Sequence, residues 1–251
     1  EFESEIFRFM ASKEVIVHIA AIDAAGKSKS PAFIPQLIAL LLITPGSNHI
    51  IESLSNYGDA IFEHLKKIPF QSVIHKQGVL SDIIRIAEIS AGPKGGEFLF
   101  SILHHSPPHL KERIVEVLSI SKYILEPKEK ERMERMLKEE IGFAVALLEG
   151  IEDASLNPRL HEAFNFDYEN CKRRIITISG LLYNRKIMRE ASAAFRNNSK
   201  ERRANALEIM EQVIPRKTAQ ILIVLLDNIS PAQKINKLQD FHIVRKHEIP
   251  D

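Results

Sequence analysis

The sequence has a single cysteine, no tryptophan and few residues of the kinds that interrupt helices. Of its 251 residues, 10 are glycine and 12 are proline. The one cysteine, Cys171, cannot form an internal disulfide and cannot supply a cysteine-based zinc site. These absences exclude disulfide-scaffolded and zinc-ribbon folds, and they favour a reducing compartment, which we expect to be the cytoplasm.

The sequence also lacks a large net charge and any long hydrophobic run. The 34 lysines and arginines nearly balance 33 aspartates and glutamates, so no global field steers the chain to nucleic acid or to a membrane. The longest apolar run, Ile34 to Ile43, is half of the roughly 20 residues that a membrane span needs. The chain begins at Glu1 without a methionine or a signal-peptide pattern, and we expect it to be a fragment of a longer protein.

Apolar side chains recur at the spacing of α-helices. One stripe follows Asn157, a favourable N-cap residue, and consists of Leu160, Phe164, Tyr168, Cys171, Ile175, Ile178 and Leu182. Another stripe follows Pro127 and consists of Met133, Leu137, Ile141, Ala144, Leu148 and Ile151. The alternation that half-buried strands require is almost absent. The sequence therefore predicts an all-α protein.

A short motif recurs in the first half of the chain at nearly constant spacing. An apolar segment ends at Gly26, at Gly58 and at Gly92, which are 32 and 34 residues apart, and a second apolar segment follows each glycine. Glycine readily adopts the left-handed conformation that ends many helices, so we expect all three to be C-cap residues within helical hairpins. A repeat of this length predicts stacked hairpins rather than one closed core.

Two segments imitate functional motifs but lack the residues that the chemistry needs. The segment from Ala21 to Ser28 ends like a phosphate-binding loop, yet Ala21 stands where the first glycine of that loop is required. His104, His105 and His109 flank a Ser-Pro-Pro turn and lack the fixed spacing of zinc ligands. No spacing in the sequence places an acid, a base and a nucleophile together, as the active site of an enzyme requires. The sequence thus predicts a non-enzymatic protein without catalytic residues, metal site or cofactor.

The strongest local signal is positive charge between Lys172 and Lys217, where basic residues exceed acidic ones by eight. We expect a partner-binding surface formed by Lys172, Arg173, Arg185, Lys186, Arg189, Lys200, Arg202 and Arg216. An acidic protein, an anionic lipid surface, nucleic acid and plain solvated helix surface all remain open as interpretations of this charge. The region offers few aromatic side chains for base stacking, which disfavours single-stranded nucleic acid.

Two stretches resemble known helical-repeat proteins. The glycine-ended repeat, with phrases such as the one from Ser30 to Leu41, resembles HEAT-type repeats over about residues 11 to 122. The stretch from Asn157 through Gly180 to Leu226 resembles the soluble HEAT-repeat regions attached to bacterial membrane proteins of the ATP/ADP-translocase-like transporter class.

The HEAT resemblance implies a right-handed α-α superhelix, a solenoid of HEAT-like helical hairpins. Short-period hairpins are expected in residues 1–125, continuing repeats with longer and irregular helices in 126–241, and a tail in 242–251. The transporter resemblance implies a cytoplasmic domain that is tethered to a membrane protein through a segment missing from this sequence.

The sequence as a whole predicts a non-enzymatic interaction or scaffold domain whose partner lies along a curved helical surface. The transporter resemblance implies a more specific form, a soluble regulatory domain of a membrane transporter. The alternative is a HEAT-like nucleic-acid-binding protein that uses the basic region 172–217. An affinity that falls steeply with salt concentration identifies this alternative, because released counterions drive the binding.

Overall fold

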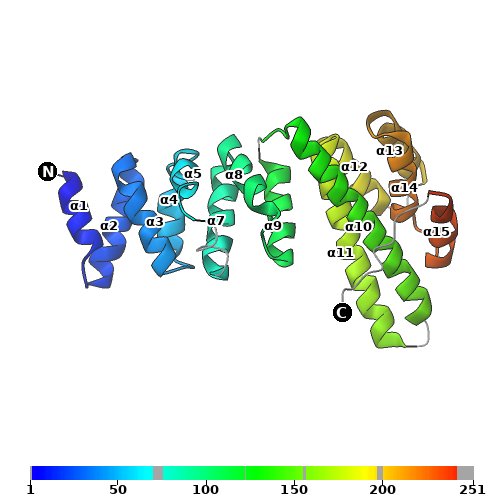
Figure 1. The fold of residues 1–251 in the computed structure, drawn as a ribbon, viewed down its shortest axis with the longest axis horizontal. Coiled ribbons are helices and arrows are strands. Elements are labelled where there is room, and N and C mark those ends of the chain that lie inside the picture. Colours follow the sequence, from blue (N-terminus) through cyan, green and yellow to red (C-terminus); the bar gives the residue numbers. More distant parts are fainter. Residues whose placement is uncertain (1, 70–75, 122, 155–156, 197–199, 242–251) are drawn as a thin grey trace. The chain divides into compact units, whose positions relative to one another are not determined.

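The computed structural model describes residues 2–69, 76–121, 123–154, 157–196 and 200–241, which form helices and no β-strand (Figure 1). The prediction of an all-α protein is therefore confirmed. The described residues divide into two compact units, unit 1 within Glu1–Ile124 and unit 2 within Leu125–Asp251. Each unit has a buried apolar core of its own.

Unit 1 consists of short helices that pack in chain order. They are α1 (Phe2–Met10), α2 (Val15–Ser28), the 3-10 helix η1 (Pro31–Phe33), α3 (Ile34–Ile43), α4 (Asn48–Ser55), α5 (Ala60–Leu65), α7 (Gln77–Ser90), α8 (Pro93–Leu103) and α9 (Pro108–Ile120). Helix α2 packs against α4, α4 against α7 and α7 against α9 (Figure 1). A second series is formed by α3, α5 and α8, each of which contacts the next.

Hydrogen bonds between successive helices of unit 1 join residues that are about one repeat apart. The buried hydroxyl of Ser53 in α4 donates to the carbonyl of Ile22 in α2 at 2.9 Å, across 31 residues. The hydroxyl of Tyr57 donates to the carbonyl of Ala25 at 2.6 Å, across 32 residues. The spacing of the sequence repeat thus matches the separation of residues that are hydrogen-bonded between α2 and the segment formed by α4 and the turn after it.

The three repeat glycines have different structural roles. Gly58 has the expected left-handed conformation, with φ +58°, in the turn after α4. The prediction is wrong for Gly26, which lies inside α2, where an added Cβ would be 2.6 Å from Cα of Ser53. It is also wrong for Gly92, which is the N-cap of α8 with φ −89°, while Ala91 before it takes the left-handed conformation. Gly26 is needed for the close approach of α2 to α4.

Unit 2 contains longer helices. They are α10 (Pro127–Asp153), α11 (Pro158–Leu182), α12 (Arg185–Arg196), α13 (Lys200–Val213), α14 (Arg216–Leu226), α15 (Pro231–Leu238) and the 3-10 helix η3 (Gln239–Phe241). Helices α10 and α11 pack along each other, α12 lies between α11 and α13, and α15 packs against α10 and α14.

The predicted stripes of the two long helices are largely correct. Every member of the α10 stripe is buried, as expected. In α11 the side chain of Asn157 accepts a hydrogen bond from the N–H of Leu160 at 3.4 Å, which confirms the predicted N-cap. The buried face of α11 begins only at Tyr168, however, because Leu160 is half exposed.

The core of unit 2 includes a buried lysine, Lys234 of α15, which is 5% exposed. Its ammonium group donates to the carbonyl of Leu225 at the end of α14, at 3.0 Å, and to the hydroxyl of Tyr168 in α11, at 3.2 Å. That hydroxyl donates to the same carbonyl at 2.8 Å. Lys234 therefore connects three helices. Burial, together with a smaller effect of the positive charge of Lys172, lowers the pKa of Lys234 to about 8.

Replacement of Gly26 by alanine should destabilise unit 1 by about 1–3 kcal/mol, because the added methyl group overlaps with Ser53 of α4. Chemical unfolding followed by circular dichroism measures this change. Gly180→Ala is the matched control, since the nearest atom to its Cβ is the Cα of Arg185 at 3.5 Å, an ordinary contact. The control should leave stability unchanged or raise it by about 0.5–1 kcal/mol. Equal effects of the two changes would contradict the close approach of α2 and α4.

The free energy of unfolding should rise with pH because of Lys234. Its pKa is lowered from 10.5 to about 8 in the folded chain, so between these values the unfolded chain binds more protons than the folded chain. This lysine should therefore add about 1 kcal/mol of stability between pH 7 and pH 9. Burial raises the pKa of Tyr168 and of Cys171, so these groups lower stability as the pH approaches and passes their ordinary values of 10.0 and 9.0, equally in the wild type and in a variant of Lys234.

Lys234→Met isolates this effect, because methionine fills a similar volume and the hydroxyl of Tyr168 still donates to the carbonyl of Leu225. Urea unfolding at pH 7, 8 and 9 measures both proteins. The difference between them should grow in favour of the wild type as pH rises. A difference that is constant across this range would show that Lys234 remains fully protonated.

Candidate functional site

The predicted basic residues lie on several helices of unit 2, and half of them expose their side chains. Arg173 of α11, Lys186 and Arg189 of α12 and Arg216 of α14 are exposed. Lys186 and Arg189 are three residues apart and share one face of α12. The side chains of the two predicted residues Lys200 and Arg202 lie outside the part of the chain that the structure describes.

Lys172 and Arg185 are partly buried, so they contribute less to a binding surface than the sequence suggests. The ammonium group of Lys172 lies 5.1 Å from the ring centre of Tyr168 and 2.5 Å from the carboxylate of Glu169. Burial lowers the pKa of Arg185. Lys172 therefore lies beside the same Tyr168 side chain that Lys234 contacts.

Arg174, which the sequence does not distinguish from its neighbours, connects α11 to α10. Its Nε donates to the carboxylate of Glu140 at 3.0 Å, and both side chains are about one-fifth exposed. The thiol of Cys171 lies 3.4 Å from the same carboxylate, and burial raises the pKa of this thiol. A buried thiol with a raised pKa is a poor nucleophile, and these contacts are structural.

The exposed basic side chains have few acidic neighbours. Lys186 is 4.0 Å from Glu190, which is a loose pair of exposed groups. Within the described parts of unit 2, no ion pair joins Arg173, Arg189 or Arg216 to a carboxylate. Their charges are therefore available to a partner.

A groove of about 440 Å³ lies in unit 2 between α10 and α14. Its floor consists of Leu137 and Ile141 of α10 and Ile221 of α14, which are all buried, and Pro215 and Phe241 add apolar lining. Tyr183 and Thr218 form one wall. Burial raises the pKa of Tyr183. The groove combines an apolar floor with hydroxyl groups.

Charged side chains line the rim of this groove. Lys138 of α10 and Lys217 of α14 contribute positive charge, and Glu134 of α10 contributes negative charge. Neither lysine is joined to a carboxylate by an ion pair among the residues that the structure describes. The rim therefore has an excess of positive charge.

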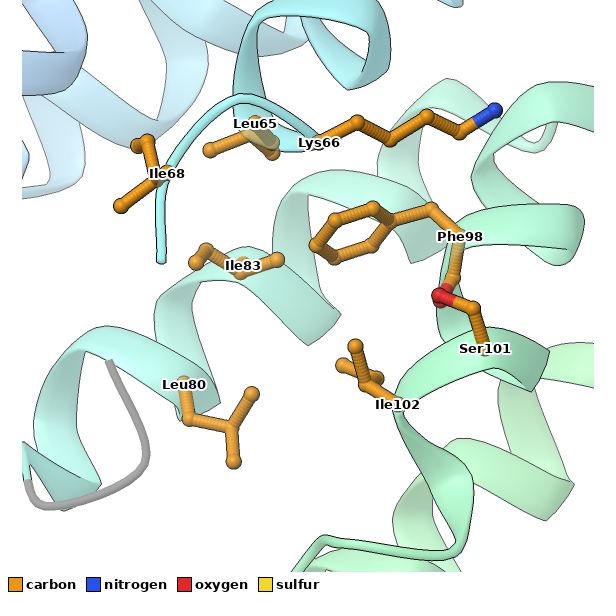
Figure 2. A pocket seen from close by; sticks show the side chains of 8 residues that line it. All are labelled: Leu65, Lys66, Ile68, Leu80, Ile83, Phe98, Ser101 and Ile102. Atoms are coloured by element: carbon orange, nitrogen blue, oxygen red, sulfur yellow. The ribbon is translucent and has the colours of Figure 1, made fainter. Parts of the chain in front are cut away.

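Unit 1 contains a smaller pocket of about 130 Å³ between α5, α7 and α8 (Figure 2). Leu80 and Ile83 of α7 and Phe98 and Ile102 of α8 line it, while the amino group of Lys66 points away from these apolar side chains. Sites for small ligands usually have volumes of roughly 300–1,000 Å³. The pocket is smaller than that, and we interpret it as a gap in the packing of three helices.

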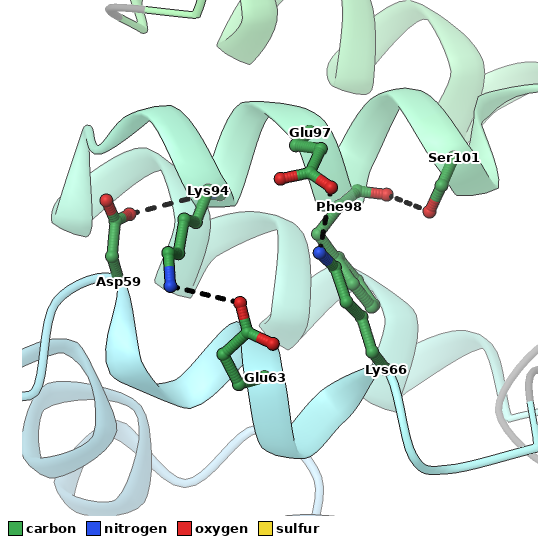
Figure 3. A network of polar contacts seen from close by, with 8 residues as sticks. Asp59, Glu63, Lys66, Lys94, Glu97, Phe98 and Ser101 are labelled. Carbon is green, nitrogen blue, oxygen red and sulfur yellow. Dashed lines mark hydrogen bonds and ion pairs between the residues drawn. The ribbon is translucent and has the colours of Figure 1, made fainter.

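Next to this pocket, two ion pairs join α8 to α5 and to Lys66 at its end (Figure 3). The ammonium group of Lys94 donates to Glu63 at 3.0 Å, and that of Lys66 donates to Glu97 at 2.9 Å. Asp59 accepts an N–H of the first turn of α8 at 3.4 Å. The hydrogen bond from Lys94 lowers the pKa of Glu63, and the one to Glu97 raises the pKa of Lys66. Water screens these exposed pairs, so each adds little to stability.

The segments that imitate catalytic or metal-binding motifs have ordinary structural roles. Ala21 to Ser28 lie within α2, where interior backbone N–H groups bond within the helix and cannot surround a phosphate. His104, His105 and His109 are exposed at the turn between α8 and α9. In the described ranges, no group of three or more histidine, cysteine or acidic side chains is arranged to hold a metal ion.

The sequence gives no signal for the groove, because its lining comes from positions as far apart as Glu134 and Phe241. Among the described helices, none combines the length and the apolar character that a bilayer crossing requires. In comparisons with known proteins, no family model, no curated protein and no solved structure matches this chain.

Proposed function

We propose that this chain is a non-enzymatic interaction module, a right-handed HEAT-like solenoid of helical hairpins that binds an acidic protein segment. The observation that carries the proposal is the set of exposed basic side chains in unit 2. The chief ones are Lys186 and Arg189 of α12, and Arg173 of α11 and Arg216 of α14 are exposed as well. Three of these four have no acidic partner among the described residues.

The packing of unit 1 supports the solenoid part of the proposal. Helices α2, α4, α7 and α9 contact one another in chain order, and hydrogen bonds such as that from Ser53 to Ile22 connect positions one repeat apart. In a solenoid each hairpin is stabilised by its neighbours, and the faces not used for stacking form an extended binding surface.

The charge of α12 and α14 supports an acidic partner. Helix α12 has four basic residues and one acidic residue, and α14 begins with Arg216 and Lys217 and has no acidic residue. An acidic segment approaching these helices gains favourable electrostatic interactions, chiefly as a faster association rate.

A protein partner is favoured over single-stranded nucleic acid because the basic region from Lys172 to Lys217 has only two aromatic residues, Tyr183 and Phe195, for base stacking. Tyr183, the aromatic residue that precedes α12, is partly buried and lines the groove between α10 and α14. Regulation of a membrane transporter stays a prediction that rests on the resemblance of the stretch from Asn157 to Leu226.

The double variant Lys186→Glu/Arg189→Glu should bind a fluorescein-labelled polyglutamate peptide about tenfold or more weakly than the wild type, since two attractive charges become repulsive. Fluorescence anisotropy of the full chain at low salt measures the affinity. The matched control is Lys128→Glu/Lys130→Glu on the exposed first turn of α10, which changes the net charge equally. The control should keep most of the wild-type affinity.

Two outcomes would overturn the proposal. An equal loss in both double variants would mean that only net charge attracts the peptide. Tighter binding of labelled oligothymidylate than of polyglutamate, with log affinity falling steeply against log salt, would make nucleic acid the partner.

A further inference from the structure

We infer that the groove between α10 and α14 binds a small amphipathic carboxylate, a molecule with an aliphatic or aromatic body and one carboxylate group. The inference goes beyond the proposed interaction module, because it concerns a different surface. The groove is lined by residues of α10 and α14 and by Tyr183, Pro215 and Phe241, whereas the proposed protein contact centres on Lys186 and Arg189 of α12.

The floor of the groove provides the apolar part of the site. Leu137, Ile141 and Ile221 are no more than 8% exposed, and Pro215 and Phe241, which also line the groove, add more exposed apolar surface. The volume of about 440 Å³ falls within the range of roughly 300–1,000 Å³ that is usual for small-molecule sites. An apolar ligand body gains free energy by displacing water from this floor.

The rim provides the polar part. Lys138 and Lys217 approach the groove from two different helices, and neither is neutralised by an ion pair with a described carboxylate. A ligand carboxylate at this rim would accept charge-assisted hydrogen bonds, which are the stronger kind. Glu134 is the acidic side chain that faces the groove, so the two lysines outnumber it and favour an anion over a cation.

The wall adds hydroxyl groups to this arrangement. Tyr183 and Thr218 both line the groove and present their hydroxyl groups as its polar side chains beside the charged ones. A few convergent polar groups over an apolar floor are the composition typical of small-molecule sites.

The dimensions favour a small molecule over a docked helix. A helix that binds in a groove places apolar anchors at positions i, i+4 and i+7, which span two turns. The apolar floor that α10 contributes runs from Leu137 to Ile141, which is one turn. A helical peptide would therefore place part of its apolar stripe against the charged rim.

Titration of the full chain with decanoate, followed by amide NMR spectra, tests the inference. We expect saturable shifts centred on the amides of Ile141, Thr218 and Ile221. In the Lys138→Glu/Lys217→Glu variant, decanoate should bind about tenfold or more weakly, because the carboxylate loses both cations. Decanol, which has the same apolar body without charge, should bind the variant and the wild type equally.

Both lysines are exposed, so the double variant should fold normally. The control Lys128→Glu/Lys130→Glu changes the net charge equally outside the groove lining and should leave decanoate binding intact. Unsaturable shifts, shifts that map to the pocket beside Phe98, or equal weakening by both double variants would overturn the inference. None of these results bears on polyglutamate binding, which depends on Lys186 and Arg189.

Discussion

Burial of apolar faces between successive helices is the constraint on which the rest of the molecule depends. The helices of unit 1 are 6 to 14 residues long, apart from one short 3-10 turn, and isolated helices of such length are unstable in water. They persist because fully buried side chains such as Ile51 and Leu80 fill the spaces between neighbours. Gly26 and Ser53 allow α2 and α4 to approach closely, so a single position controls how tightly two neighbouring helices stack.

Unit 2 depends on the same constraint but adds polar groups to its core. The cluster of Tyr168, Lys234 and the carbonyl of Leu225 joins three helices through mutual hydrogen bonds. Arg174 and Glu140 join α11 to α10 in a similar way. Buried polar contacts of this kind require defined geometry, whereas apolar contacts tolerate shifts. They therefore fix how the long helices are aligned, and with them the positions of the groove lining and of the exposed basic side chains.

The sequence predicts the helices well because apolar spacing reports burial directly, as in the stripe from Met133 to Ile151. Prediction from the sequence fails where one residue type can have two different structural roles. Glycine serves both left-handed turns and close helix contacts, and Gly58 and Gly26 cannot be distinguished without their neighbours. Lys172 and Arg173 are likewise adjacent in a basic run, yet a helix turns by about 100° per residue, so one is partly buried and the other exposed. The groove escapes sequence analysis because it is assembled from distant segments.

The burial of Lys234 also makes it a reporter of motion in unit 2. Its amine is buried beneath α15 and is enclosed by Tyr168 and the end of α14. An acylating reagent reaches it only when α15 detaches. The rate at which this lysine is acylated therefore measures how often the end of the domain opens, and any ligand that holds α15 in place slows the reaction.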